Sequence, residues 1–323
     1  MDSITQAVLG ASIGEVLLGK KIGNKAPALG AMIATIPDLD ILLTPLYDPL
    51  EKISLHRGLS HSILFCFIGA FLFSWILGNI KWTGLQSYKD RWMLTFLALF
   101  THVMLDTFTA YGTQLFLPIT DWRVGFDSIS IIDPVYTVPL LGGLFLSLFL
   151  SSKSVVRKSL PNKIGLILSS VYLLFTLVNK QHVNQEFKSQ LADQNIQNSD
   201  LLTVPVKIGY IHWYGVAKNS TSLHIGQYSV LGKNSIQFQS FPINDHLLEK
   251  MDDKLVDRMK WFAKGFYTVA ESNGKIRIYN MQCDMQGVRQ YGDYSAPTAF
   301  YFEITPGQDG VSYDLNSGMH PSE

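Results

Sequence analysis

The sequence has few charged residues. Asp, Glu, Lys and Arg make up 16% of its 323 residues, whereas 47% are hydrophobic, and the mean hydropathy is +0.15. A typical soluble protein has about 25% charged residues, so this composition excludes an ordinary water-soluble enzyme. The long uncharged runs all lie before about Lys180, and the rest of the chain has the mixed composition of a soluble domain.

The sequence also lacks an excess of either charge. The 26 basic and 26 acidic residues give a net charge of zero, and no basic stripe is interleaved with aromatic residues. Nucleic acid is therefore not expected as a partner. Two widely separated cysteines, Cys66 and Cys283, predict neither a disulfide nor a thiolate metal site. The first residues lack the basic start and cleavage site of a secretory signal, so we expect the first apolar segment to be retained.

What the sequence does contain is long apolar runs. A membrane span needs about 20 mostly apolar residues, and segments 62–80, 92–105, 134–152 and 164–179 fit best. Segments 4–18 and 27–43 carry Glu15 and Pro37, which predicts short, re-entrant or buried helices. The predicted fold is a mainly α-helical membrane domain of four to six hydrophobic helices over 1–180, a linker or helix extension over 181–200, and a small soluble α+β domain over 201–323.

Positive charge is distributed unevenly between the loops. If all six segments cross, one set of loops carries ten Lys or Arg residues and the other carries five. Loops rich in positive charge tend to stay in the cytoplasm. We therefore expect a multi-pass protein of the inner (plasma) membrane whose polar segments 38–61 and 102–133, and whose C-terminal domain, are extracytoplasmic.

Two of the apolar segments end in acidic residues. Asp38 and Asp40 follow Pro37, and this pair of carboxylates either forms a turn or binds a cation. His102 and Asp106 are four residues apart, which places both on one face of a helix. They either chelate a metal together, or the Asp106 carboxylate orients the His102 imidazole.

A third polar group leads into segment 62–80. His56 and His61 flank Arg57, whose guanidinium suits phosphate or carboxylate. Ionisable residues at membrane depth usually have a function. Asp133, before Pro134, is predicted to cap the next helix.

Together these groups supply only oxygen and nitrogen donors, which favour Zn or a similar divalent ion such as Mn. Such an ion can activate water for hydrolysis. We expect Arg57, Asp40 and Tyr111 to take part in catalysis, with Arg123 as a further candidate. The predicted metal ligands are Asp38, Asp40, His56, His61, His102 and Asp106.

The stretches MDSITQAVLGASIGE, PDLD, HRGLSHS and THVMLDTFTAYGTQLFLP occur in that order over about residues 1–140. In these residues the chain resembles the YdjM-like family, membrane-bound proteins assigned as metal-dependent hydrolases. The order of Asp, His and His-x-x-x-Asp is more distantly similar to zinc-dependent phospholipase C and single-strand nucleases. That similarity implies Asp38 or Asp40, His56 or His61, His102 and Asp106 as ligands. The family pattern has a histidine where this chain has Gln6, which implies one bound ion fewer or impaired catalysis.

The C-terminal third changes pattern. Alternating, aromatic-rich stretches predict strands over 204–217, 221–232 and 234–242. An amphipathic helix is expected within 243–266, capped by Asn244 or Asp245. Further strands are expected around 265–270, 275–281 and 298–304.

Three functions fit the sequence. The leading one is a membrane-bound metal-dependent hydrolase, a phosphodiesterase or phosphatase, acting on a small-molecule or lipid ester in contact with the bilayer. The second is a non-catalytic membrane protein with a structural metal or His/Asp network and a partner-binding tail. The third is a cation transporter, because intramembrane Asp and His also line ion pathways.

Overall fold

The computed structural model describes residues 1–152, 159–206, 210–232, 235–249, 251–272, 274–282, 300–306 and 313–319. The chain forms two compact units. The first comprises Met1–Leu46 and Leu55–Val178, and the second comprises Tyr47–Ser54, Asn179–Val206 and the described residues after Tyr210. The first unit is helical and the second contains β-sheets, as the sequence predicts.

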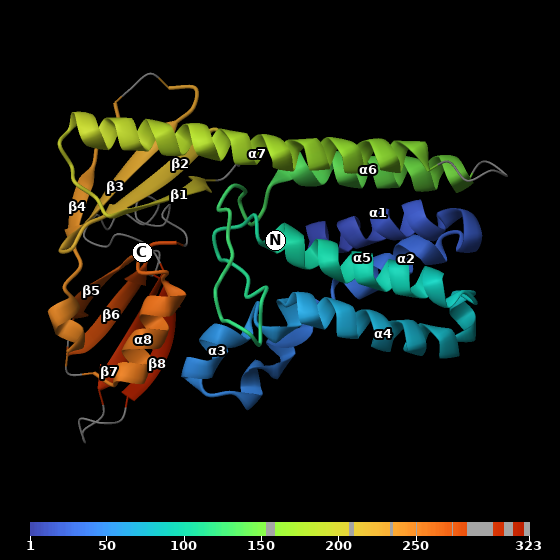
Figure 1. Cartoon of the computed structure of the whole chain (residues 1–323), viewed down its shortest axis with the longest axis horizontal. Helices are drawn as coiled ribbons and strands as arrows, with labels where there is room; N and C mark the ends of the chain where they lie inside the picture. The colour runs from blue at the N-terminus through green and yellow to red at the C-terminus, as the bar shows by residue number, and fades with distance from the viewer. Residues whose placement is uncertain are drawn as a thin grey trace. The chain divides into compact units, whose positions relative to one another are not determined.

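The regular elements of the described chain up to Asp193 are helices, and a long loop over 107–133 joins two of them. In order they are α1 (Ser3–Ile22), α2 (Lys25–Ala34), the 3-10 helix η1 (Pro37–Leu46), α3 (Pro49–Leu55), η2 (Leu59–His61), α4 (Ile63–Asn79), η3 (Lys81–Thr83), α5 (Tyr88–Asp106), α6 (Pro134–Ser152) and α7 (Leu160–Asp193). Figure 1 shows α1, α2, α4 and α5 side by side. The segment 181–200, expected as a linker or helix extension, is helical as far as Asp193.

Several helices are long and apolar enough to cross a membrane. Two described helices qualify alone, over Pro134–Ser151 and within α7. Two bent pairs also qualify if each pair counts as one span, which brings the total to four: α2 with η1, bent by 42°, and Leu50–His61 with α4, bent by 58°. The bends occur where the sequence places Pro37 and the His56–His61 motif.

Capping side chains set where the apolar helices begin. The Ser62 hydroxyl accepts from the backbone N–H of Phe65 at 3.0 Å, which starts α4. The carboxylate of Asp133 accepts from the N–H of Val135 at 2.9 Å, so its predicted capping of α6 is confirmed. The phenol of Tyr172 on α7 donates to the second oxygen of the same carboxylate at 2.8 Å. A helix start and a helix–helix contact therefore share one buried acid.

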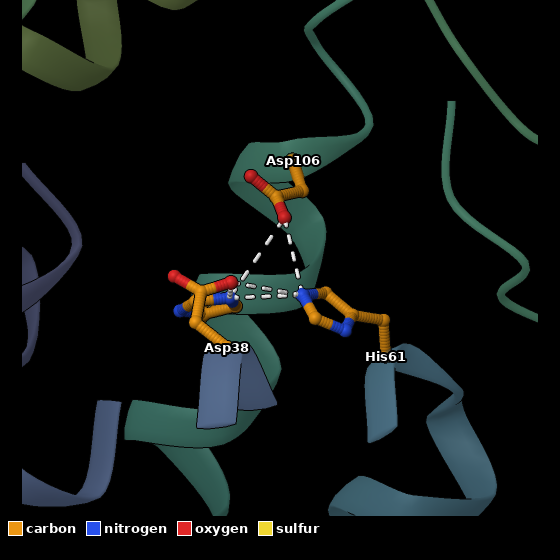
Figure 2. A group of neighbouring side chains, drawn as sticks. Asp38, His61 and Asp106 are labelled. Atoms are coloured by element: carbon orange, nitrogen blue, oxygen red, sulfur yellow. Dashed lines mark hydrogen bonds and ion pairs between the residues drawn. The ribbon is translucent and has the colours of Figure 1, made fainter. Parts of the chain in front are cut away.

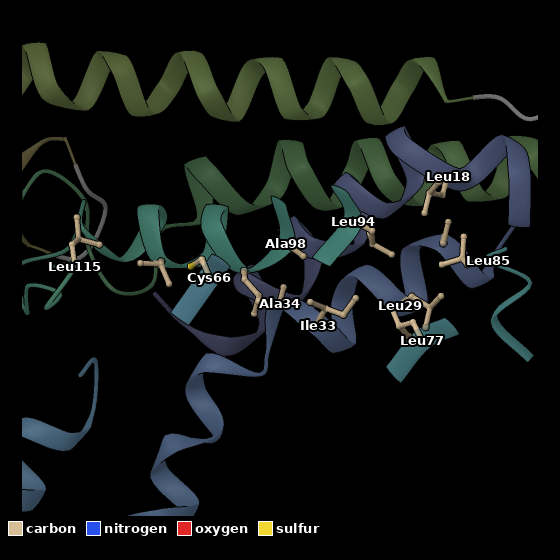
Figure 3. Packing of buried hydrophobic residues seen from close by; sticks show 13 residues of the cluster. Leu18, Leu29, Ile33, Ala34, Cys66, Leu77, Leu85, Leu94, Ala98 and Leu115 are labelled. Atoms are coloured by element: carbon tan, nitrogen blue, oxygen red, sulfur yellow. The ribbon is translucent and has the colours of Figure 1, made fainter. Parts of the chain in front are cut away.

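Glycines allow the backbones of α1 and α2 to touch. A Cβ added at Gly10 would lie 2.3 Å from the carbonyl oxygen of Gly30, and one added at Gly14 would lie 2.2 Å from that of Ala26. Leu94 and Leu99 of α5 are fully buried in the apolar cluster beside this pair, together with residues of α2 and α4 (Figure 3). This packing fixes the end of α5 relative to the start of η1.

The second unit holds two four-stranded antiparallel sheets, each with strands in sequence order. The first contains β1 (Asp200–Val206), β2 (His212–Lys218), β3 (Ser222–Ser229) and β4 (Gln239–Pro242); the second contains β5 (Tyr267–Ser272), β6 (Lys275–Asn280), β7 (Phe300–Pro306) and β8 (Tyr313–Met319). The prediction did not include β8. The α+β class is confirmed by the sheets together with α8 (Asp253–Phe262).

The predicted start of the helix in this unit is wrong. Residues Asp245–Leu248 form a short 3-10 turn, and Asn244, at φ +59°, makes no capping hydrogen bond. The α-helix starts later, because the Asp252 carboxylate accepts from the N–H of Leu255 at 3.0 Å. Asn244 and Asp252 are both residue types that commonly cap helices. The left-handed backbone of Asn244 is not the extended conformation of an N-cap, so the helix starts after Asp252.

Candidate metal centre

The end of α5 provides two donors. His102 and Asp106 are one helical turn apart, and His102 Nε2 lies 3.8 Å from Asp106 Oδ2. Both side chains are buried, because the same face of α5 carries Ala98, Leu99 and Val103 into the core. Periodicity therefore placed this pair correctly on one face of the helix.

Two 3-10 helices provide the other two donors. Asp38 lies in the first turn of η1, and His61 ends η2 directly before α4. The Nε2 atom of His61 is 3.3 Å from Asp38 Oδ1 and 3.4 Å from Asp106 Oδ2. Figure 2 marks both contacts with dashed lines. The Nε2 atom of His102 is 3.4 Å from the same Asp38 oxygen. Three separate segments thus direct four donor atoms to one point.

Five of the six separations among these four atoms are close to those around a tetrahedral metal ion. Their separations include 3.2 Å between the two imidazole Nε2 atoms and 3.3–3.8 Å from nitrogen to oxygen. Tetrahedral Zn²⁺ binds His and carboxylate atoms at about 2.0–2.2 Å, which places neighbouring ligand atoms about 3.3–3.6 Å apart. Asp38, His61, His102 and Asp106 therefore form a group that could hold a metal ion, with all four atoms within 4.8 Å of one another.

Asp40 and His56 lie beside this group rather than in it. His56 Nδ1 is 3.0 Å from Asp40 Oδ1, while Asp40 Oδ2 accepts from the Ser60 hydroxyl at 2.9 Å. The same oxygen lies 3.5 Å from Nδ1 of His61. Asp40 is buried, whereas His56 is half-buried. In this arrangement Asp40 contacts one ring of the four-residue group and one ring outside it.

Arg57 connects the two sides of the site. Its Nε lies 3.3 Å from Asp106 Oδ2, and its Nη1 donates to Thr109 Oγ1 at 2.7 Å. The backbone of Arg57 has φ +59°, a region that non-glycine residues rarely occupy, and its N–H donates to Asp40 Oδ2 at 3.2 Å. Such an outlier commonly marks a functional site.

Two guanidinium groups lie near the ring of Tyr111. The Cζ atoms of Arg57 and Arg123 are 5.0 Å and 4.7 Å from the centre of its ring. The ring of His56 approaches its edge at 5.8 Å. Both arginines are buried, so this cation–π stack holds Arg57 beside Asp106. The sequence named all four residues but gave no indication that they stack.

Gln6 contacts the cluster from α1. Its Nε2 donates to Asp106 Oδ1 at 3.1 Å and to the carbonyl oxygen of His102 at 3.3 Å. Both partners are acceptors, so the amide nitrogen must face them, and Oε1 has no hydrogen-bond partner among the described residues. The amino group of Met1 donates to the same Asp106 oxygen. Gln6 therefore contacts a candidate ligand through its nitrogen.

Sequence reasoning missed Ser60 and Thr109. The Ser60 hydroxyl lies 2.9 Å from His61 Nδ1 and bonds Asp40, while Thr109 accepts from Arg57. The position of Ser60 beside His61 was a usable signal. No sequence pattern indicates the role of Thr109, because it is far from Arg57 in the sequence and only the tertiary structure brings the two side chains together.

Comparison with known proteins identifies the family of this chain. The chain is 26% identical over 201 residues to an uncharacterised protein, YfhP, of Bacillus subtilis (strain 168), a match covering 60% of this chain and 59% of YfhP. No solved structure matches. The model of the YdjM inner membrane proteins matches residues 1–183, which include every residue of the site. The chain therefore belongs to the YdjM inner membrane protein family.

Proposed function

We propose that the chain is a membrane-bound metal-dependent hydrolase that cleaves a phosphoester at the site formed by Asp38, His61, His102 and Asp106. The observation that carries the proposal is that two imidazole nitrogens and two carboxylate oxygens converge within 4.8 Å of one another. The absence of thiolate and the spacing both suit Zn²⁺, with Mn²⁺ as the next candidate.

With all four donors bound, an ion in this site has no open tetrahedral position, so it would have to take water as a fifth ligand. It would then lower the pKa of that water and polarise a phosphoryl oxygen. The side chains around it have separate tasks. Asp40 and Ser60 hold the His61 ring from its Nδ1 side, and Gln6 holds the Asp106 carboxylate. Arg57, at 3.3 Å from Asp106, places a fixed positive charge beside the reacting phosphate.

His56 is suited to transfer protons. Asp40 fixes its Nδ1, and the ring is half-buried, 5.8 Å from the His61 ring between centres. In hydrolysis the water oxygen attacks phosphorus and the bond from phosphorus to the leaving oxygen breaks. His56 donates a proton to that oxygen and recovers one from the attacking water, while Asp40 keeps the ring oriented. The products are a phosphate monoester or inorganic phosphate and an alcohol.

The membrane context supports an extracytoplasmic site. If all six apolar segments of the sequence cross, the connections away from the site carry ten positive residues and those on the site's side carry five. We extend the proposal to place the site and the C-terminal unit on the outer face of the inner membrane.

The test is metal analysis of the purified full-length protein, followed by a panel of phosphomonoesters and phosphodiesters. Wild type should retain about one Zn²⁺ per chain and cleave at least one ester, whereas His102→Ala and Asp106→Ala should lose both properties. Metal-dependent thermal stability without cleavage of any ester would instead favour the structural-metal alternative. Absence of bound metal in wild type would overturn the proposal.

A further inference from the structure

The segment that brings Asp38 to the metal site also presents apolar side chains outward. In η1, Asp38 joins the four-residue group and Asp40 holds His56 and His61. The apolar residues between and after them are exposed, by 46–79% of their surface: Leu39, Ile41, Leu42, Leu43 and Leu46. One short helix therefore has a polar side in the site and an apolar side outside it.

The position of η1 in a candidate span explains the exposed side. The pair of α2 and η1 is apolar enough to cross a membrane, and its 42° bend falls directly before Asp38. Water strongly disfavours a row of exposed leucines, whereas lipid does not. The first donor of the candidate metal site, Asp38, therefore directly follows the bend in this candidate span. The exposed apolar side chains beside it form a surface suited to lipid chains.

A second apolar group lies on the loop after α5. Phe116, Ile119 and Trp122 are exposed, and the rings of Phe116 and Trp122 stack at 6.0 Å. This loop is tied to the site, because the N–H of Gln114 donates to the carbonyl oxygen of Arg57 at 3.2 Å. Arg57 in turn bonds Asp40 of η1 through its own N–H. Exposed tryptophan beside aliphatic side chains is typical of the membrane–water interface.

From these two apolar groups, each on a segment that bonds the backbone of Arg57, we infer that the substrate is a phospholipid of the surrounding bilayer. Its headgroup phosphate enters the site while its acyl chains stay against η1 and the loop tip. This inference rests on the proposed function. The water oxygen bonds to phosphorus and one of the two ester bonds of the headgroup phosphate breaks. The products are a phosphate monoester and an alcohol, one of which keeps the acyl chains. A freely soluble ester would use the same donors but none of the exposed leucines.

The inference can be tested with full-length, Zn-loaded protein in lipid nanodiscs. Two substrates are compared: phosphatidylglycerol in the nanodisc and the water-soluble diester bis(p-nitrophenyl) phosphate. Leu42→Asn and Leu46→Asn remove apolar surface without touching a donor, and Leu231→Asn, an equally exposed position in the second unit, is the control. The η1 variants should lower kcat/KM on the lipid about tenfold, with cleavage of the soluble diester and metal content unchanged. The control should match wild type on both substrates.

Other outcomes separate the two proposals. Cleavage of the soluble diester without cleavage of lipid, or equal losses on both substrates in the η1 variants, would overturn the lipid inference and leave the hydrolase standing. If neither of these two esters nor any ester of the panel is cleaved, the hydrolase proposal fails. A phosphatidylglycerol with a photoreactive acyl chain then tests whether η1 contacts lipid. Crosslinks within 37–46 would support this contact, and crosslinks confined to α6 and α7 would overturn it.

Discussion

The Nδ1 atom of His61 lies 3.5 Å from Oδ2 of Asp40, while Nε2 of the same ring lies 3.3 Å from Asp38. The two acids are separated by one residue and contact different atoms of one imidazole. A metal-binding histidine usually has a carboxylate or carbonyl at its other nitrogen, which fixes the tautomer and the ring orientation. This geometry fits our proposal that Asp38 is a metal ligand and that Asp40 orients His61.

Substituting the two acids should separate these roles. Asp40→Asn should weaken Zn²⁺ affinity about 10- to 100-fold without abolishing binding, because the four donors remain. Asp38→Asn, at the same segment and with the same loss of charge, should reduce binding further. Competition with a chromogenic chelator measures both. Equal affinities for the two variants would contradict the assignment.

His56 and His61 should behave differently in the same assays. His56→Ala should keep its metal but lose about 10²- to 10⁴-fold in kcat, because it removes only the proton-transfer group. His61→Ala should lose the metal itself. His212→Ala, an exposed histidine of the second unit, is the control for purification and for adventitious binding. Metal loss in His56→Ala would make that residue a ligand instead.

Gln6 should affect affinity but not stoichiometry. Its amide nitrogen bonds two acceptors, so Gln6→Leu removes an orientation of Asp106 rather than a ligand. We expect the same number of ions per chain and a fall in affinity of about tenfold. Elemental analysis at saturating metal gives the number, and chelator competition gives the affinity. A lower number of ions per chain would show that the side chain turns its oxygen to a metal.

Two adjacent glycines in α6 provide a matched test of helix packing. A Cβ at Gly143 would lie 2.6 Å from the carbonyl oxygen of Pro161 in α7, whereas one at Gly142 meets nothing within 4 Å. Gly143→Ala should destabilise the protein by about 1–3 kcal/mol. Gly142→Ala should be neutral or stabilising, because alanine favours a helix by about 1 kcal/mol. Thermal unfolding in detergent measures the difference, and equal melting temperatures would contradict the close contact.

The proposed orientation can be tested at two exposed positions, one in the loop after α5 and one just beyond the end of α4. Thr120 lies in the exposed loop on the site's side, and Lys81 is exposed just beyond the other end of α4. In a Cys283→Ser background, where Cys66 is buried, an impermeant maleimide should label Thr120→Cys on intact cells. Lys81→Cys should react only after lysis. The reverse pattern would place the site in the cytoplasm.

The sequence predicted most of the helical part of the fold, but segment 92–105, predicted as a span, lies in α5, which is not among the candidate spans of the described residues. The uncharged run at 62–80 became α4, and the run at 134–152 became α6, because each follows a capping residue, Ser62 or Asp133. These features are local: an apolar run needs a nonpolar environment, and a cap satisfies free N–H groups within one turn. The prediction of the second unit was coarser, since two candidate caps stood eight residues apart and only the backbone of Asn244 distinguishes them.

The sequence alone determined that His and Asp residues gather at the ends of apolar helices, and that His102 and Asp106 share a face. It did not determine which of six candidate donors meet. In a 3-10 helix, successive side chains are about 120° apart, so Asp38 and Asp40 point in different directions, and the sequence cannot say which direction faces the site. Only the tertiary structure decided this, because the close packing of α1, α2 and α5 places η1 and η2 against the end of α5.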